Sequence, residues 1–104
     1  MDEPQKRYRV VVWDQAEYLA EFLALPPAQQ DRVADLYNNH LPLRPNQMKP
    51  PMLKQLHGNQ SHLRQFECGG GKRLHYEVDE EAMEVRIVNL GKHLEWDKRG
   101  KVGG

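Results

Sequence analysis

The sequence has few of the residues that cross-link a small protein. Cys68 is the only cysteine among 104 residues, which excludes an internal disulfide and a multi-cysteine zinc site. A single thiol is also typical of proteins that fold in a reducing compartment. Of the five histidines, His57 and His62 are close in sequence, but no second close pair of ligands accompanies them. We therefore expect no metal ion and no other cofactor.

Long hydrophobic runs are equally scarce. The first seven residues are polar, and no apolar stretch is long enough for a signal peptide or a membrane span. The chain is 38% apolar and 29% charged, which is typical of one globular domain that buries a core of its own. We expect a single cytoplasmic domain over residues 1–104, with its core in about residues 8–96 and a flexible tail over 97–104.

Two common enzyme motifs are missing as well. Ser61 is the only serine and no Gly-x-Ser-x-Gly sequence surrounds it, which argues against a serine nucleophile. Three glycines at 69–71 precede Lys72, as in a phosphate-binding loop. However, Arg73 stands where that loop needs Ser or Thr, and Phe66 stands where it needs glycine. The glycines therefore predict a hairpin turn.

Charge of one sign is not in excess, because 15 Lys and Arg balance 15 Asp and Glu. The charges are unevenly spread along the chain. Residues 1–43 contain four basic and seven acidic side chains, residues 44–75 contain six and one, and residues 76–104 contain five and seven. The middle third thus indicates either a local basic surface for nucleic acid or a solvated surface whose charges cancel in the folded molecule.

The first half of the chain has the pattern of one strand and two helices. Residues 8–13 are rich in β-branched and aromatic side chains, and Asp14 is a good N-cap for a helix over 15–25. Pro26 and Pro27 end that helix, and Pro27 can open a second one that continues to Asn38 and Asn39. We expect the two helices to form an antiparallel hairpin.

The second half has the pattern of a meander. Residues 42–60 contain four prolines and predict an ordered but irregular connection. Strands are then expected over 62–68, 72–79 and 83–90. The last of these has apolar residues of both parities, which predicts that it is irregular or covered on both sides. The chain is thus expected to be α+β, with one N-terminal strand, a helix hairpin and a three-stranded antiparallel meander, and with the helices on one face of the sheet.

The two-residue period of the strand over 72–79 separates its side chains by face. Leu74, Tyr76 and Val78 are expected to point to the core. Arg73 and His75, with Glu77 and Asp79, are expected on the opposite, polar face, which the helices leave open.

Three segments in this order resemble the RelE/ParE toxin superfamily. The first is Met-Leu-Lys-Gln-Leu-His-Gly at 52–58, and the second is Leu-Arg-Gln-Phe at 63–66. The third is Lys-Arg-Leu-His-Tyr-Glu-Val-Asp at 72–79, and a final strand then ends in Asn-Leu-Gly-Lys-His at 89–93. The resemblance covers about residues 8–96 and implies the same strand, helix-pair and meander order.

The resemblance also implies a function. Members of this superfamily are toxins that a co-expressed antitoxin protein holds inactive. Those of the RelE branch cleave messenger RNA on the ribosome, without a metal ion, and those of the ParE branch poison DNA gyrase. The same fold thus serves an enzyme and a non-enzyme, and the site has to decide between them.

The resemblance assigns catalytic roles to Arg73 and His93. Arg73 matches the arginine beside the scissile phosphate, and its guanidinium can bind two phosphate oxygens. The alternative is a surface arginine paired with Glu77. His93 stands where many relatives have arginine and can transfer a proton, or it is an exposed histidine of a degraded site.

Further residues are candidates for RNA binding. Trp96 lies near the place of a tyrosine in relatives, where it can stack on a base but cannot accept a proton; otherwise it closes the core edge. The remaining candidates are basic residues that can contact phosphate, or are ordinary surface charges: Lys49, Lys54, Arg64, His75 and Lys92.

Our hypothesis from the sequence is therefore the toxin of a type II toxin–antitoxin system, an endoribonuclease that cleaves translated mRNA and inhibits translation. Its expected partners are an antitoxin, mRNA and the ribosome, with no membrane contact. The alternatives are a ParE-like inhibitor of DNA gyrase and an inactive relative that binds only its antitoxin.

Overall fold

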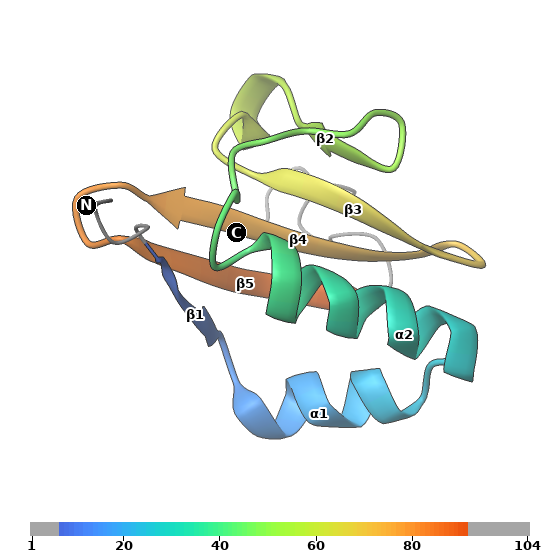
Figure 1. Cartoon of the computed structure of the whole chain (residues 1–104). Coiled ribbons are helices and arrows are strands. Elements are labelled where there is room, and N and C mark those ends of the chain that lie inside the picture. The colour runs from blue at the N-terminus through green and yellow to red at the C-terminus, as the bar shows by residue number, and fades with distance from the viewer. Residues whose placement is uncertain (1–6, 92–104) are drawn as a thin grey trace, which may run out of the picture.

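A five-stranded sheet carries two helices on one of its faces (Figure 1). This computed structural model describes residues 7–91. The elements in chain order are β1 (Arg9–Val12), α1 (Gln15–Leu23), α2 (Pro27–Asp35), β2 (Leu53–Gln55), β3 (Arg64–Gly69), β4 (Lys72–Asp79) and β5 (Glu84–Gly91). The predicted α+β class, with the helices on one face, is confirmed.

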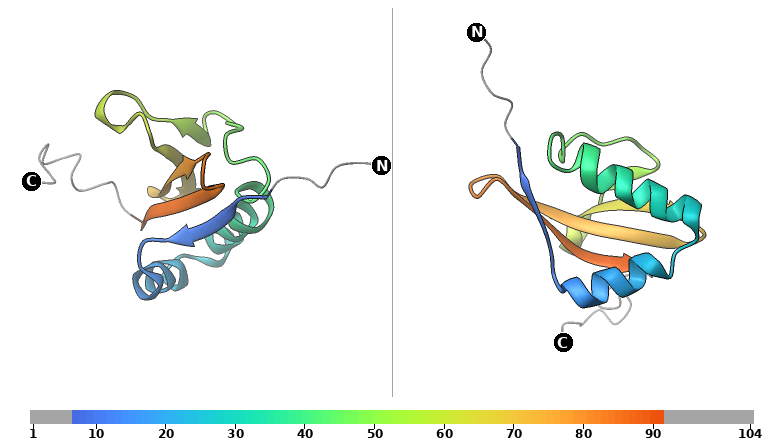
Figure 2. Two further views of the ribbon diagram at one scale, coloured as in Figure 1. Left: turned by 90° about the vertical axis from the view of Figure 1, so that its left-hand side faces the viewer. Right: turned by 60° about the horizontal axis from the view of Figure 1, so that its bottom comes forward.

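The strand order in the sheet is β1-β5-β4-β3-β2. Strands β2 to β5 form an antiparallel meander, whereas β1 pairs in parallel with β5. The N-terminal strand therefore lies beside the last described strand, although more than 70 residues separate them along the chain. Figure 2 shows both helices on the same side of this sheet, with β1 at its edge.

The helix hairpin follows the predicted signals closely. The Asp14 side chain accepts a hydrogen bond from the Glu17 backbone N–H at 2.9 Å and so caps α1. Helix α1 ends at Leu23, two residues before the predicted end, because the prolines at 26 and 27 disfavour helical backbone before them. Pro27 opens α2 as expected, and the chain continues from α2 into a π-helical turn over Leu36–His40.

The connection predicted as irregular contains a short strand. Strand β2 pairs with β3, and a 3₁₀ turn follows over Gly58–Gln60. Only Leu53 of the three β2 residues is buried. So short a segment has no recognisable period, which is why the sequence pattern misses it.

The core lies between the helices and the sheet. Leu74 and Tyr76 of β4 are fully buried there, as predicted, together with Val33 of α2 and Ile87 of β5. Each such side chain stabilises the fold by about 1.5–3 kcal/mol through burial of apolar surface. No residue of α1 is fully buried, and Leu19 and Leu23 are more than half exposed. No helix within residues 7–91 is long and apolar enough to span a membrane.

Strand β5 is irregular, as its mixed parity predicts. Tyr76 pairs with Ile87 and His75 pairs with Asn89, so that Val88 is an extra residue at a shift in register. The shift brings Leu90 opposite Leu74, and Leu90 joins Ile87 in the core. The predicted hairpin turn between β3 and β4 is also present. Gly70 and Gly71 have φ of 60° and 80°, values that glycine adopts without strain.

Candidate functional site

The face of the sheet opposite the helices, which we call the outer face, carries a network of polar side chains. Glu67 of β3 lies opposite Arg73 of β4, and Gln65 lies opposite His75. On the other side of β4, His75 lies opposite Asn89 of β5. These residues alternate with Leu74 and Tyr76, which point into the core. The outer face is therefore built by three neighbouring strands.

Arg73 is held by a carboxylate on the neighbouring strand. Its Nε donates to Glu67 Oε2 at 2.8 Å, and the two side chains are 22% and 29% exposed. The acidic partner is therefore Glu67 rather than Glu77, which the sequence offered as an alternative. Directly opposed side chains on adjacent strands lie closer than residues two apart on one strand. Glu77 instead contacts Arg86 at 3.5 Å.

Glu67 is the end of a hydrogen-bonded row. Gln65 Nε2 donates to Glu67 Oε2 at 3.3 Å, and Gln65 Oε1 lies 2.9 Å from His75 Nε2. Asn89 Nδ2 lies 3.0 Å from His75 Nδ1. An acceptor at Nε2 and a donor at Nδ1 suit the neutral imidazole that carries its proton on Nε2.

His75 lies on the predicted face, but its side chain is not exposed. The residue is 1% exposed and is hydrogen-bonded to side chains on both neighbouring strands. The expectation of a solvent-facing His75 is wrong, because the residue is buried and side chains of both neighbouring strands, Gln65 and Asn89, contact its ring. Its position therefore gives no support to the prediction that it contacts RNA.

A second charged cluster surrounds Arg86 further along the outer face. Arg86 contacts Glu84 and Asp79 at 2.7 Å each, and Arg9 of β1 reaches Glu84 at 2.7 Å. Hydrogen bonds from Arg9 and Arg86 lower the pKa of Glu84. Hydrogen bonds from the Ala82 backbone and from Arg86 lower the pKa of Asp79. This cluster ties β1, β4 and β5 together by charge.

The described outer face is balanced in charge. Strand pairing places four basic residues and four acidic residues on it: Arg9, Lys54, Arg73, Arg86, Glu67, Glu77, Asp79 and Glu84. The basic excess of the middle third of the sequence is therefore not gathered here. Lys54 is exposed and lies opposite Gln65, on the same face as Arg73.

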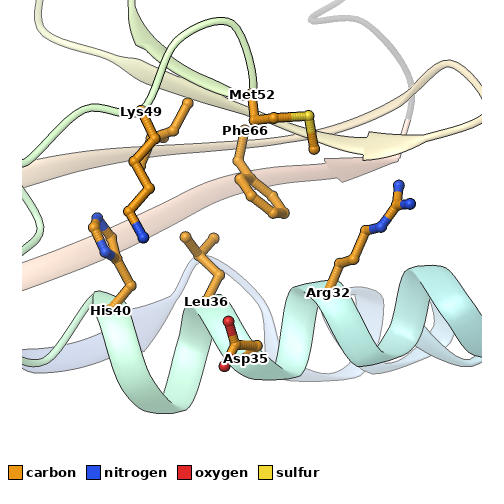
Figure 3. A pocket seen from close by; sticks show the side chains of 8 residues that line it. Arg32, Asp35, Leu36, His40, Lys49, Met52 and Phe66 are labelled. Carbon is orange, nitrogen blue, oxygen red and sulfur yellow. The ribbon is translucent and has the colours of Figure 1, made fainter.

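Two predicted phosphate contacts lie on the helix side instead. Arg64 lies opposite Tyr76, and its Nη2 donates to Asn46 Oδ1 at 2.6 Å. Lys49 lines a small hollow between α2 and β2 (Figure 3), near His40 and Phe66. Burial lowers the pKa of His40, and the nearby Lys49 and Arg44 charges act in the same direction. The structure therefore does not bring Arg64 and Lys49 together with Arg73.

Comparisons with known proteins identify the fold through solved structures alone. No family model and no curated protein matches the sequence. Among solved structures, the chain is similar to the toxin–antitoxin complex RelBE2 from Mycobacterium tuberculosis, with a TM-score of 0.60 and 21% identity over 88% of this chain and 98% of that one. The archaeal RelE–RelB complex from Pyrococcus horikoshii gives a TM-score of 0.63 and 22% identity over 83% and 94%. The chain has the RelE toxin fold.

A third similar structure is the YoeB–YefM toxin–antitoxin complex from Staphylococcus aureus, with a TM-score of 0.56 and 17% identity over 85% of this chain and 99% of that one. The RelE fold thus accounts for nearly the full length of each of these three chains. The predicted superfamily fold is confirmed by these structures.

Three of the predicted site residues lie outside residues 7–91, namely Lys92, His93 and Trp96. The last residue of β5, Gly91, does lie near the site, because it pairs with Arg73. Arg73 thus has Glu67 on one neighbouring strand and the end of β5 on the other.

Glu67 is the residue that sequence reasoning missed. A simple two-residue turn at Gly70 and Gly71 would pair Cys68 with Arg73 and leave Glu67 out of line. A shift in register between Glu67 and Gly69 moves Glu67 opposite Arg73 instead. The available signal was the single acidic residue of the basic middle third, six residues before Arg73 across a glycine turn.

Proposed function

We propose that this chain is the toxin of a type II toxin–antitoxin pair and that it inhibits translation by cleaving mRNA on the ribosome without a metal ion. The observation that carries the proposal is the RelE fold with a partly exposed Arg73 on the outer face. Two of the similar structures are toxin–antitoxin complexes, which supports an antitoxin as the partner of this chain.

Arg73 is the proposed contact to the scissile phosphate. RNA cleavage without a metal needs a cation that stabilises charge on the phosphorus-centred transition state, a base for the 2′-hydroxyl and an acid for the leaving 5′-oxygen. A guanidinium fits the first task because its donors match two phosphate oxygens. His93 is the proposed acid, supported by the pairing of Gly91 with Arg73 two residues before it.

The other proposed RNA contacts follow from position. Lys54 shares the outer face with Arg73 and can bind the RNA backbone there. Lys92 and Trp96 remain proposals from the sequence. Arg64 and Lys49 lie on the helix side and His75 is buried, so these three are not among the proposed contacts.

The test is a short induction of the full chain in a bacterial host, with protein, RNA and DNA synthesis followed separately and transcript 5′ ends mapped. We expect early loss of protein synthesis and new 5′ ends inside reading frames. Arg73→Ala should abolish both, whereas Arg86→Ala, which removes another arginine of the outer face, should not. Growth arrest of wild-type strength by a folded Arg73→Ala protein would contradict the proposal.

Inhibition of DNA gyrase is the second candidate. The charge balance of the described outer face favours it, because a surface that binds a polyanion usually has an excess of positive charge. This candidate predicts loss of DNA synthesis and of supercoiling while translation continues at first. An inactive relative that binds only its antitoxin predicts harmless expression of a folded protein.

A further inference from the structure

The Glu67–Arg73 pair is both accessible and geometrically defined. The side chains are 29% and 22% exposed, and Glu67 Oε2 accepts from Arg73 Nε at 2.8 Å. The contact from Gln65 also goes to Oε2. Within residues 7–91, no hydrogen bond reaches Glu67 Oε1, and this oxygen is not among the buried atoms without a partner. One oxygen of the carboxylate thus accepts hydrogen bonds from Arg73 and Gln65, whereas the other accepts none from the described residues.

The carboxylate is oriented by side chains that are themselves fixed. Gln65 contacts Glu67 with its amide nitrogen and His75 with its amide oxygen. His75 is buried and is in turn contacted by Asn89. A chain of hydrogen bonds from a buried ring to an exposed carboxylate holds that carboxylate in one direction before any ligand arrives, which is the arrangement that a reacting group requires.

The pair also suits RNA as a substrate. The 2′-hydroxyl and the 3′-phosphate of a ribonucleotide sit on adjacent ring carbons, so the group that deprotonates the hydroxyl has to lie beside the group that binds the phosphate. A base must come within about 2.6–3.2 Å of the proton it removes. A carboxylate in contact with the phosphate-binding arginine can meet both demands at once.

We propose that Glu67 is the general base of the RNA cleavage, which rests on the function proposed above. The Glu67 carboxylate takes the 2′-hydroxyl proton while the 2′-oxygen forms a bond to phosphorus. The bond from phosphorus to the 5′-oxygen breaks, and this oxygen takes a proton from a general acid or from water. The products are a 2′,3′-cyclic phosphate and a 5′-hydroxyl, and Glu67 returns its proton to solvent.

A different role for Glu67 makes the opposite prediction. If the carboxylate only neutralised Arg73, it would compete with phosphate, and its removal would strengthen RNA binding and speed cleavage. The sign of the change in rate for Glu67→Gln therefore separates a base from a competitor. This variant keeps the shape of the side chain and an oxygen that can accept from Arg73.

The test uses the full chain in a reconstituted bacterial translation system with a defined mRNA, under single-turnover conditions. We expect Glu67→Gln to slow cleavage by about 100-fold or more, within the range typical of general bases. The same mRNA with a 2′-deoxy nucleotide at the cleavage position should be bound by Glu67→Gln at least as tightly as by wild type. Added formate should restore part of the rate of Glu67→Ala, which a structural role would not allow.

The matched control is Glu77→Gln. Glu77 has the same 29% exposure on the outer face but contacts Arg86 instead of Arg73, so cleavage should stay within about twofold of wild type. If wild type cleaves the mRNA and Glu67→Gln cleaves it at the same or a faster rate, Glu67 is not the base. This outcome would leave the proposed nuclease itself standing. Absence of cleavage by wild type would overturn the proposed nuclease, and the inference with it.

Discussion

At the scale of single residues, Tyr76 connects the sheet to the chain after the helices. It is fully buried, and its hydroxyl donates to the Pro45 carbonyl at 2.6 Å. Burial raises the pKa of Tyr76, because the core disfavours the charged phenolate. A buried carbonyl that loses its donor keeps the full cost of its desolvation. This bond therefore fixes the segment that leads from α2 toward β2.

We predict that Tyr76→Phe lowers the free energy of unfolding by about 1–2 kcal/mol, because the Pro45 carbonyl is left without its donor. Urea denaturation followed by circular dichroism measures this change. Tyr8→Phe is the control, since the Tyr8 hydroxyl donates to Glu80 in an exposed contact, and it should cost less than about 0.5 kcal/mol. Equal midpoints for the two variants would show that the buried bond contributes little.

At the scale of elements, α1 combines a capped first turn with two partly buried side chains, Tyr18 and Phe22, that pack against the core. None of its residues is fully buried, and Leu19 and Leu23 are largely exposed. Nine residues form a marginal helix in water. The Asp14 cap satisfies the Glu17 N–H at the first turn, and it also places a negative charge at the positive end of the helix dipole.

We predict that Asp14→Ala lowers the free energy of unfolding by about 1 kcal/mol, and that Asp14→Asn loses less because asparagine also caps helices. Thermal unfolding of the three proteins provides the measurement. Hydrogen exchange should show faster opening in α1 than in β4 for the alanine variant. Exchange that rises equally throughout the sheet would argue against a local role of the cap.

Elements with a strong local signal could be predicted from the sequence. Asp14, Pro27 and the glycine turn each fix a boundary through local backbone chemistry, and the period of β4 separates Leu74 from Arg73. Strand β2 could not be predicted, because its three residues become a strand only by pairing with β3. Its existence is a tertiary effect.

The site was predictable only in part, for the same reason. The outward position of Arg73 follows from the period of β4. The contact between Glu67 and Arg73 depends on a shift in register that no local pattern marks. The burial of His75 depends on Gln65 and Asn89, which reach it from two other strands. Side-chain partners across strands are set by pairing, which the sequence does not state.

At the scale of the whole molecule, charge connects the two ends of the described chain. Arg9 of β1 and Arg86 of β5 both contact Glu84, and Arg86 also contacts Asp79. The pKa values of Glu84 and Asp79 are lowered in the folded protein. The unfolded chain therefore binds protons at these groups more readily than the folded protein, and acid favours unfolding.

We predict that Glu84 and Asp79 make their full contribution to the free energy of unfolding near neutral pH. This contribution should begin to fall as the pH drops below about 4.5, the ordinary value for a glutamate carboxyl, and continue to fall through the lowered pKa values. Urea midpoints between pH 7 and pH 2.5 measure the curve. Glu84→Gln should be less stable at pH 7 and should show a smaller loss in acid. An equally steep acid loss in that variant would place the sensitivity in other groups.

The strand order also has a consequence for the time at which the molecule becomes complete during its synthesis. Strand β1 and both helices leave the ribosome first, yet the partner of β1 is β5, which is made last among the described elements. Folding has to wait for contacts between distant parts of the chain, which are slow to form. The pairing that aligns Gly91 with Arg73 exists only after residue 91 has emerged. A nascent chain therefore carries an incomplete outer face. Each copy completes the described part of this face only after the ribosome has made β5.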